Sequence, residues 1–336
     1  ILAKTIISFK KVYIKKTKVN YGIIYVKGDL MKALISEIET LPVDLKERLN
    51  SMGFDYDIIL DSEEIKHPED YDFVFGANHV KKLGVDKFSK LKWIQNSYAG
   101  YNNLPVDELK SKGILFTNAK DVFSDPIAEW AVMYILMYYK NALPNYEQQK
   151  QHQWVRVHNR ELEQMNVCIV GIGSIGQAIR KRLEPFNVNF IGVNSRGTET
   201  EGFNTVYSVK ELETAVMMSD VVVITLPLND QTQNLFSREL IFNMKKGSIL
   251  LNVGRGRIID EDALVEALES EHLAFCALDV MAKEPVEKES RLWDCKNLVL
   301  TPHVSGTGDY TKERLWKIFE YNCHQFKLGK ELKNII

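Results

Sequence analysis

Residues 166–183 read NVCIVGIGSIGQAIRKRL, and this stretch decides the fold. Residues 167–170 are apolar, which is typical of a buried strand. Helical spacing begins at residue 177. Between the apolar run and this helical segment lie three glycines in the spacing GxGxxG: Gly171, Gly173 and Gly176. Glycines in this spacing allow a tight turn, close approach of a pyrophosphate, and packing of the helix on the strand. The stretch therefore predicts a dinucleotide site in which Ser174 and Ile175 present N–H groups at a helix N-terminus.

Two series of short β-branched or aromatic runs alternate with helical patterns along the chain, which indicates βαβ units around parallel sheets. The second series has six strand candidates: residues 166–170, 189–193, 221–226, 248–253, 274–280 and 297–301. The first series has five: residues 22–26, 56–60, 72–75, 92–95 and 114–117, separated by segments such as 30–40. Six strands match a full dinucleotide-binding fold, and the first series predicts a further open sheet.

The 336 residues correspond to roughly two domains of ordinary size. Asp125 is expected to cap a helix that opens with Pro126 and joins the domains. The tail after residue 304 has helical spacing and is expected to pack back on the first domain. We therefore expect an α/β fold of two doubly wound parallel-sheet domains. A Rossmann cofactor domain (122–303) would be inserted in a flavodoxin-like substrate domain (1–121 and 304–336).

The composition argues against several classes of function. Lys plus Arg number 43 and Asp plus Glu 45, so a net charge of −2 gives no general attraction to nucleic acid or to anionic membranes. The longest apolar run, 127–143, is broken by Glu129 and Lys140 and is too short to span a bilayer. The chain has four widely spaced cysteines: Cys168, Cys276, Cys295 and Cys323. They lack CxxC spacing, so we expect buried thiols in a reducing cytoplasm and no metal site.

Two polar segments are expected at the surface. The Lys-rich residues 1–20 lack the apolar stretch and cleavage site of a signal peptide, which favours a surface strand or arm. An amphipathic targeting or lipid-binding segment is the alternative there. Residues 148–160 contain His152, Trp154 and His158 in a polar context, which favours an exposed stretch or a subunit contact over catalysis.

The residue after the second strand of a dinucleotide fold influences which cofactor binds, since an acid there hydrogen-bonds the ribose hydroxyls of NAD. This sequence has Asn194 at that place, followed by Ser195 and Arg196. An amide, a hydroxyl and a guanidinium replace the carboxylate that would repel a 2′-phosphate. We therefore expect NADP(H) to be preferred. The alternative is NAD(H), with Arg196 stacked on adenine or turned to solvent.

Ligands of an open α/β sheet bind beyond the carboxyl ends of its strands, and this edge carries charged groups here. Leu226 and Pro227 follow the third strand of the series, and the later strands are followed by Arg255, Asp279, Glu284 and His303. A fixed cation, two acids and an imidazole are suited to hold a carboxylate substrate and to move a proton during hydride transfer. Taken singly, each also has a structural explanation, such as a salt bridge or a solvated loop acid.

Seven motifs, in order along the chain, resemble those of the D-isomer-specific 2-hydroxyacid dehydrogenase family. They are SYAGYNNLP from Ser97, DPIAEWA from Asp125, GIGSIG from Gly171, LPLNDQT from Leu226, LNVGRGRIIDEDAL from Leu251, ALDVMAKEP from Ala277 and TPHVSG from Thr301. The resemblance covers the chain from about residue 70 onward, and the first fifty or so residues have no match.

The resemblance implies roles for several residues of these motifs in substrate binding, proton transfer and cofactor binding. Arg255 would bind the substrate carboxylate and polarise the carbonyl, while His303, paired with Glu284, would exchange the proton. Backbone N–H groups of the substrate loop would hold the carboxylate, around Tyr98, Ala99 and Gly100. The resemblance places five residues beside the cofactor: Leu226, Pro227, Thr232, Val253 and Gly254. Asp279 would hydrogen-bond the nicotinamide carboxamide.

The resemblance, together with the residues from Asn194 to Arg196, leads us to expect an NADPH-preferring reductase of small 2-oxoacids. A homodimer formed through the cofactor domain is what the resemblance implies. Glyoxylate, hydroxypyruvate, pyruvate and branched 2-oxoacids all stay open as substrates, because the side-chain pocket lies in the poorly matched first domain. 3-Phosphoglycerate is a further candidate, whereas formate dehydrogenase relatives carry glutamine where Glu284 stands. The alternative class is a dinucleotide-sensing co-repressor of the same fold, which the lack of a long biased tail in this sequence disfavours.

Overall fold

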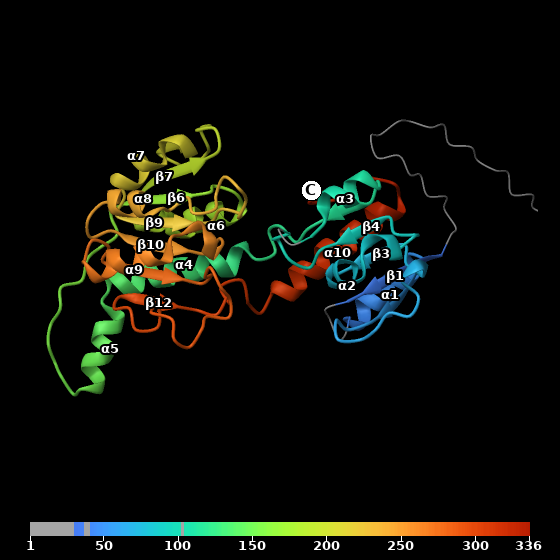
Figure 1. Ribbon diagram of the computed structural model, residues 1–336, viewed down its shortest axis with the longest axis horizontal. Coiled ribbons are helices and arrows are strands. Elements are labelled where there is room, and N and C mark those ends of the chain that lie inside the picture. The colour runs from blue at the N-terminus through green and yellow to red at the C-terminus, as the bar shows by residue number, and fades with distance from the viewer. Residues whose placement is uncertain (1–29, 37–40, 102–103) are drawn as a thin grey trace, which may run out of the picture.

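The structure is a computed structural model and describes residues 30–36, 41–101 and 104–336. The chain forms two α/β lobes, which are joined by α4 (Ser124–Tyr139) and by the segment that leads into α10 (Thr311–Lys327), as Figure 1 shows. The strand expected at residues 22–26 and the Lys-rich residues 1–20 lie outside the described residues.

The first lobe contains a parallel sheet of five strands in the order β2-β1-β3-β4-β5. Its strands are β1 (Met31–Ile35), β2 (Phe54–Ile58), β3 (Phe73–Phe75), β4 (Trp93–Gln95) and β5 (Leu115–Thr117). The helices between them are α1 (Val43–Ser51), α2 (Asn78–Leu83) and α3 (Val106–Ser111). This strand order is that of flavodoxin-like folds, so the expected architecture of the lobe is confirmed.

The second lobe contains a parallel sheet of seven strands in the order β12-β11-β10-β9-β6-β7-β8. Its strands are β6 (Asn166–Val170), β7 (Asn189–Asn194), β8 (Thr205–Ser208), β9 (Val221–Ile224), β10 (Ile249–Asn252), β11 (Phe275–Leu278) and β12 (Leu298–Leu300). Its helices, besides α4, are α5 (Ala142–Lys150), α6 (Ser174–Leu183), α7 (Leu212–Met217), α8 (Arg238–Asn243) and α9 (Glu261–Glu269). Counted from β6, the order 3-2-1-4-5-6 with one added strand is that of the Rossmann fold.

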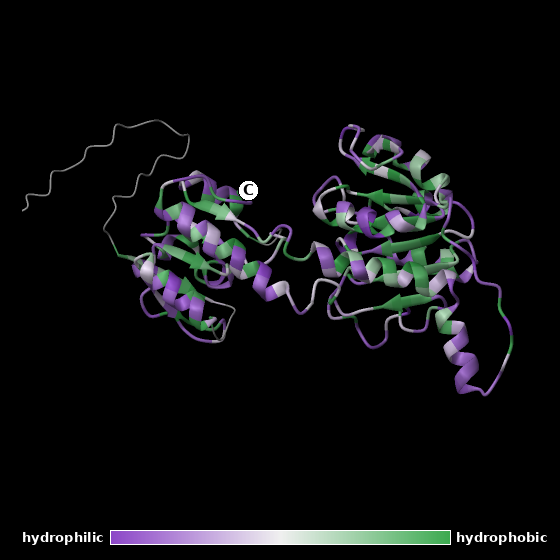
Figure 2. Cartoon of the chain, turned by 180° about the vertical axis from the view of Figure 1, so that it is seen from behind, coloured by the Kyte–Doolittle hydropathy of each residue, from purple (hydrophilic) through white to green (hydrophobic). Residues whose placement is uncertain are grey.

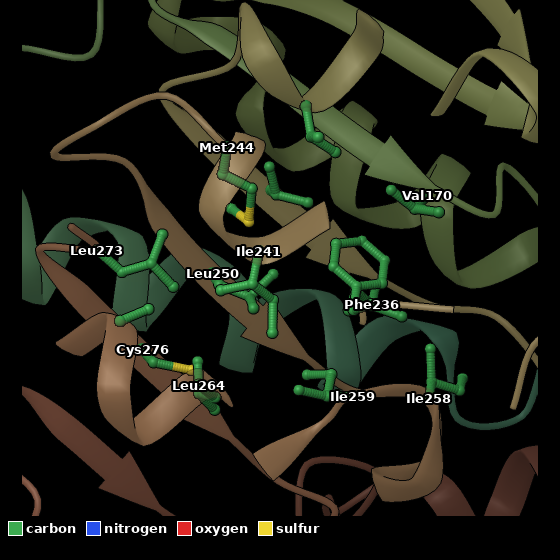
Figure 3. Packing of buried hydrophobic residues seen from close by; sticks show 14 of the residues in the cluster. Val170, Phe236, Ile241, Met244, Leu250, Ile258, Ile259, Leu264, Leu273 and Cys276 are labelled. Atoms are coloured by element: carbon green, nitrogen blue, oxygen red, sulfur yellow. The ribbon is translucent and has the colours of Figure 1, made fainter. Parts of the chain in front are cut away.

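Apolar residues cover both faces of the larger sheet, as parallel sheets require. Along β6, Cys168 and Val170 belong to the core on one face, and Val167 and Ile169 to the core on the other. Figure 3 shows the packing on the first face, where Phe236 lies among side chains from several elements. Hydrophobic residues concentrate in the strands, whereas α5 is hydrophilic (Figure 2).

The C-terminal helix completes the first lobe, which confirms the expectation for the tail. Leu315, Trp316, Phe319, Cys323 and Phe326 of α10 belong to the same core as β1 and β3. The ring centroids of Phe75 and Phe319 lie 4.7 Å apart, and those of Phe75 and Trp316 lie 5.0 Å apart. Aromatic pairs at these distances add to the energy of burial.

Two strands differ from the predictions. Residues 30–40 were expected to separate strands, but Met31–Ile35 form β1, which pairs with both β2 and β3. Met, Ala and Leu favour helices only weakly, and burial on both faces of a sheet outweighs that preference. The strand β8 was not predicted, because TVYS is short and partly exposed at the sheet edge.

The helix that joins the lobes begins at Ser124, and the prediction that Asp125 caps it is wrong. Phe123 occupies the N-cap position, and no side chain caps the helix there. The carboxylate of Asp125 instead contacts two guanidinium groups, Arg182 at 2.8 Å and Arg314 at 3.3 Å. Two positive charges attract this carboxylate more strongly than the N–H groups of the helix do. Asp125 thus links α6 of the second lobe to α10 of the first.

The segment from α5 to β6 projects from the second lobe, as Figure 1 shows. Trp154 in this segment is 96% exposed, and His152 and His158 are exposed too, as expected for a surface stretch. None of the helices in the described ranges is both long and apolar enough to cross a bilayer.

Candidate active site

The glycine motif connects β6 to α6 and fits a bound pyrophosphate. Gly171 has φ +100°, and an added Cβ would lie 2.8 Å from Thr225 Oγ1. A Cβ on Gly176 would lie 2.4 Å from the carbonyl oxygen of Gly171, so this glycine lets the helix approach the strand. Beside Gly173 no atom lies within 4 Å of an added Cβ. The first three N–H groups of α6 donate to no acceptor within the described part of the chain, as an anion site requires.

Asn194 ends β7, and its side chain closes the loop that follows. Its Oδ1 accepts hydrogen bonds from the N–H groups of Arg196 (3.0 Å), Gly197 (2.7 Å) and Thr198 (3.1 Å). Its Nδ2 donates to the carbonyl oxygen of Thr198 at 2.8 Å. Ser195 and Arg196 are exposed, and Arg196 makes no ion pair with any residue that the structure describes. The amide of Asn194 therefore braces the loop that carries the exposed guanidinium.

Arg255 follows β10 between two glycines, and both are needed for its position. A Cβ on Gly254 would lie 2.6 Å from the carbonyl oxygen of Leu226, and one on Gly256 would lie 1.8 Å from the carbonyl carbon of Met281. The Arg255 loop is therefore held against the loops after β9 and β11. Across the lobes, a Cβ on Gly100 would lie 1.9 Å from Arg255 Nη2, so a side chain at this position would displace the guanidinium from its place against the loop.

His303 and Glu284 come from the loops after β12 and β11 and lie in direct contact. His303 Nδ1 is 2.9 Å from Glu284 Oε2, and the other oxygen, Oε1, accepts the N–H of Met281 at 3.0 Å. Both carboxylate oxygens are thus engaged, which fixes the orientation of the imidazole and leaves its Nε2 directed away from Glu284.

Asp279, which follows β11, is 1% exposed and organises the loop that carries His303. Its Oδ1 accepts the Thr301 hydroxyl at 2.6 Å and the N–H of Val304 at 2.9 Å, and Oδ2 accepts the N–H of Ser305 at 2.9 Å. A carboxylate has about four lone-pair directions, so one direction stays open.

The other residues expected beside the cofactor lie around the loop after β9. Thr232 Oγ1 donates to the carbonyl oxygen of Pro227 at 2.7 Å and accepts the N–H of Asn229 at 2.8 Å, which closes this loop. Leu226 is partly buried, and Val253 is 5% exposed. The loop with Tyr98, Ala99 and Gly100 follows β4, and the Tyr98 side chain is 58% exposed.

Two groups around Arg255 have shifted pKa values. Burial lowers the pKa of Arg255, and the negative charge of Glu284 opposes that shift. A guanidinium stays protonated in proteins, so Arg255 remains a cation for a substrate carboxylate. Burial also raises the pKa of Glu261, although the Ala282 N–H, which donates to it at 2.6 Å, acts in the opposite direction.

Sequence reasoning missed three buried asparagines at this site. Asn252, fully buried, donates from Nδ2 to the carbonyl oxygen of Arg255 at 3.0 Å and accepts the N–H of Gly254 at 2.9 Å. Asn96 and Asn118 are 3% and 5% exposed and hydrogen-bond the substrate loop. Each follows or ends a strand at the carboxyl edge of its sheet, which is the sequence signal that could have identified them.

The chain is similar to known proteins in both sequence and fold. The family profile described as "D-isomer specific 2-hydroxyacid dehydrogenase, NAD binding domain" matches residues 132–305. Glyoxylate reductase of Pyrococcus horikoshii is 31% identical over 263 residues, which are 76% of this chain and 78% of that protein. Glyoxylate/hydroxypyruvate reductase B of Cronobacter sakazakii is 31% identical over 303 residues, covering 84% of this chain and 91% of that protein.

A solved structure of similar fold is that of a D-isomer specific 2-hydroxyacid dehydrogenase family protein from Aeromonas salmonicida. It superimposes with a TM-score of 0.78 at 29% identity and covers 92% of this chain and 99% of that one. The fold and the nucleotide turn define an NAD(P)-dependent oxidoreductase. The chain belongs to the D-isomer-specific 2-hydroxyacid dehydrogenase family, and it is an enzyme that moves a hydride between NAD(P)(H) and a 2-hydroxyacid/2-oxoacid pair.

Proposed function

We propose that this enzyme reduces small 2-oxoacids to D-2-hydroxyacids and prefers NADPH. The observation that carries the proposal is the meeting of the lobes at Arg255. Its guanidinium lies against the backbone of Gly100, and Glu284, which orients His303, is close enough to act on the pKa of Arg255. A carboxylate clamp and a proton donor thus lie near each other.

In the proposed mechanism, each residue acts on one part of the substrate. Arg255 and the N–H groups around Tyr98, Ala99 and Gly100 bind the carboxylate, and Arg255 polarises the adjacent carbonyl. The reduced nicotinamide, when bound, supplies the hydride for the carbonyl carbon. His303 donates a proton from Nε2 to the carbonyl oxygen, because Nδ1 faces Glu284, and the hydroxyacid results. Glu284 accepts from Nδ1 and so holds the imidazole in this orientation.

The proposed cofactor site uses the residues around the glycine motif. The N–H groups from Ser174 to Gly176 would hold the pyrophosphate, and Leu226, Pro227, Thr232, Val253 and Gly254 would line the nicotinamide half. The open lone-pair direction of Asp279 would receive the carboxamide N–H. The preference for NADPH is supported by Arg196, which is exposed and forms no ion pair within the described ranges, and by Asn194 and Ser195, which stand where an NAD-specific site has a carboxylate.

We also propose that residues 122–303 form the cofactor domain, that 1–121 and 304–336 form the substrate domain, and that two copies dimerise through the cofactor domain. The projecting segment from α5 to β6 supports the dimer, because an indole that is 96% exposed is suited to burial in a contact. The cysteines of the described ranges are free thiols, which supports a reducing cytoplasmic location.

The test is an absorbance assay of NADPH and NADH consumption with glyoxylate, hydroxypyruvate, pyruvate, a branched 2-oxoacid and 3-phosphohydroxypyruvate. We expect turnover of at least one small 2-oxoacid, with a higher kcat/KM for NADPH. Tight cofactor binding without turnover of any of them would contradict the proposal, and dominant turnover of 3-phosphohydroxypyruvate would move the substrate to 3-phosphoglycerate.

A further inference from the structure

The backbone of the substrate loop is held from behind by side-chain amides. Asn96 Nδ2 donates to the carbonyl oxygens of Tyr98 at 2.8 Å and Gly100 at 3.0 Å. Asn118 Nδ2 donates to the carbonyl oxygen of Ala99, which lies between them, at 2.7 Å. Three consecutive carbonyl groups thus point toward two buried amides.

This arrangement decides where the N–H groups of the loop point. In a trans peptide, the N–H of one residue points opposite to the carbonyl of the residue before it. The carbonyls of residues 98–100 point inward, so the N–H groups of Ala99, Gly100 and Tyr101 point away from the two asparagines. None of these three N–H groups donates to an acceptor in the described ranges. Successive outward N–H groups form a backbone nest that binds anions.

The guanidinium of Arg255 lies beside Gly100, the middle residue of this nest. A Cβ on Gly100 would be 1.9 Å from its Nη2, so backbone donors and a cation meet at one place. The Arg255 loop is braced in a similar way from the second lobe, since buried Asn252 bonds the backbone of Gly254 and Arg255. Both sides of the anion site are therefore fixed by buried amides.

We propose that Asn96 and Asn118 are positioning residues for the substrate carboxylate. By holding the carbonyls inward they keep the N–H groups of Ala99, Gly100 and Tyr101 directed at the anion beside Arg255. The inference rests on the proposed function, because it assigns the anion as the carboxylate of the 2-oxoacid. It adds that the affinity of this site depends on side chains that never touch the substrate.

The test uses Asn96→Asp and Asn118→Asp, which keep the shape of the side chain but remove the donors. A carboxylate oxygen beside a carbonyl oxygen repels it, so the loop should turn and lose its outward N–H groups. We expect KM for glyoxylate to rise by about 10-fold or more, as for a lost hydrogen bond to a charged group, with a smaller change in kcat. The Kd of NADPH should change less than about 2-fold.

The matched control is Asn322→Asp. Asn322 is fully buried in the same lobe and donates to Gln95 Oε1 at 2.8 Å and to the carbonyl oxygen of Lys333 at 3.2 Å. Its amide reaches the backbone of Asn96 only through Gln95 and donates to none of the carbonyls of residues 98–100. This control should lose thermal stability but keep KM for glyoxylate within about 2-fold. Oxamate, an unreactive analogue of a small 2-oxoacid, reports binding of the carboxylate without turnover. If the two loop variants fold and keep both KM for glyoxylate and the Kd of oxamate at the wild-type values, the inference is wrong.

A measurement on the wild-type enzyme covers the case in which the variants do not fold. With 15N-labelled alanine, glycine and tyrosine, the amide resonances of Ala99, Gly100 and Tyr101 should shift when oxamate is added to the NADPH complex. Unshifted amides in an oxamate-saturated sample would overturn the inference. A wild-type enzyme that reduces no 2-oxoacid would overturn the proposed function separately, because the NMR shifts do not require turnover.

Discussion

The backbone of His303 lies in the left-handed region with φ 54°, a conformation that residues other than glycine rarely adopt. Its N–H donates to the carbonyl oxygens of Thr301 at 2.9 Å and Asp279 at 3.0 Å, and the Asp279 side chain binds the two N–H groups that follow. Such local strain persists where surrounding bonds over-determine it, as is common at reactive residues. The backbone therefore aims the imidazole before any substrate arrives.

His303→Ala tests the role of the imidazole. Removing a general acid should lower kcat by about 10² to 10⁴-fold, while the Kd of NADPH stays within about 2-fold because no backbone donor is lost. Steady-state kinetics and fluorescence titration with NADPH measure the two effects. The control is His67→Ala, which removes an exposed histidine that also contacts a carboxylate, Glu69 at 3.3 Å. An unchanged kcat in His303→Ala would remove this residue from the mechanism.

Arg196→Ala tests the preference for NADPH. The guanidinium is exposed and has no ion pair in the described part of the chain, so it is available to a 2′-phosphate. Losing a charge-assisted hydrogen bond should weaken NADPH binding by about 10-fold or more and leave NADH within about 2-fold. Lys181→Ala, which removes an exposed positive charge from α6, shows how much of the effect comes from the loss of any nearby positive charge. Equal losses for both cofactors would contradict the role of Arg196.

At the scale of elements, α9 carries a half-buried carboxylate at its first residue. Burial raises the pKa of Glu261, and the negative charges of Asp262 and Glu284 act in the same direction. An acid whose pKa is raised on folding binds its proton more tightly in the folded state. The stabilisation that Glu261 gives in its protonated form is therefore fully present below the pKa of the unfolded chain, near 4.5. It is lost as the pH rises through the higher pKa of the folded state.

Glu261→Gln should consequently stabilise the protein at neutral pH, because the amide oxygen can still accept the Ala282 N–H without a buried charge. The gain in the free energy of unfolding should disappear near pH 4. Urea denaturation at a series of pH values measures it. Asp262→Asn removes the same charge from an exposed position of the helix and should show no such gain. A variant less stable than wild type at pH 7 would contradict the argument.

The elements also show how far the sequence predicts the fold. Ten of the twelve strands in the described part of the chain overlap predicted ranges, because their apolar runs are short and bounded by turn residues, as in β6 and β9. In β1, MKALI has helix-forming residues, and only pairing with β2 and β3 makes it a strand. Such pairing joins residues 20 to 40 positions apart, which a local pattern cannot reveal.

At the scale of the whole molecule, the two connections between the lobes lie together. A Cβ on Gly306 would be 3.3 Å from Phe123, and one on Gly308 would be 3.4 Å from Pro126. Arg314 Nη1 donates to the carbonyl oxygen of Val122 at 3.3 Å, and its Nη2 pairs with Asp125. Asp125 therefore couples the two lobes at the hinge through guanidinium groups from both.

Asp125→Asn tests this coupling. Partly exposed ion pairs contribute about 0.2–1 kcal/mol each, so loss of two should raise KM for the 2-oxoacid by about 2 to 30-fold through a looser connection between the lobes. The ratio of variant to wild-type KM should fall toward one at high salt, since screening weakens the same pairs in the wild-type enzyme. Glu129→Gln, which loses only the contact with Arg182 at 3.4 Å inside one lobe, should leave KM unchanged. A salt-independent difference in KM would speak against the hinge role.

The sequence by itself determined the glycine turn, the carboxyl edges of the strands and the residues that stand there, including Arg255, Glu284 and His303. These follow from local rules, since a turn needs glycine and a buried strand needs apolar neighbours. Only the tertiary structure decided that Asn96 and Asn118 brace the substrate loop and that Asp125 joins two arginines. Such contacts depend on which distant segments pack together. From the sequence alone, the same side chains are equally compatible with helix caps or with solvated polar groups.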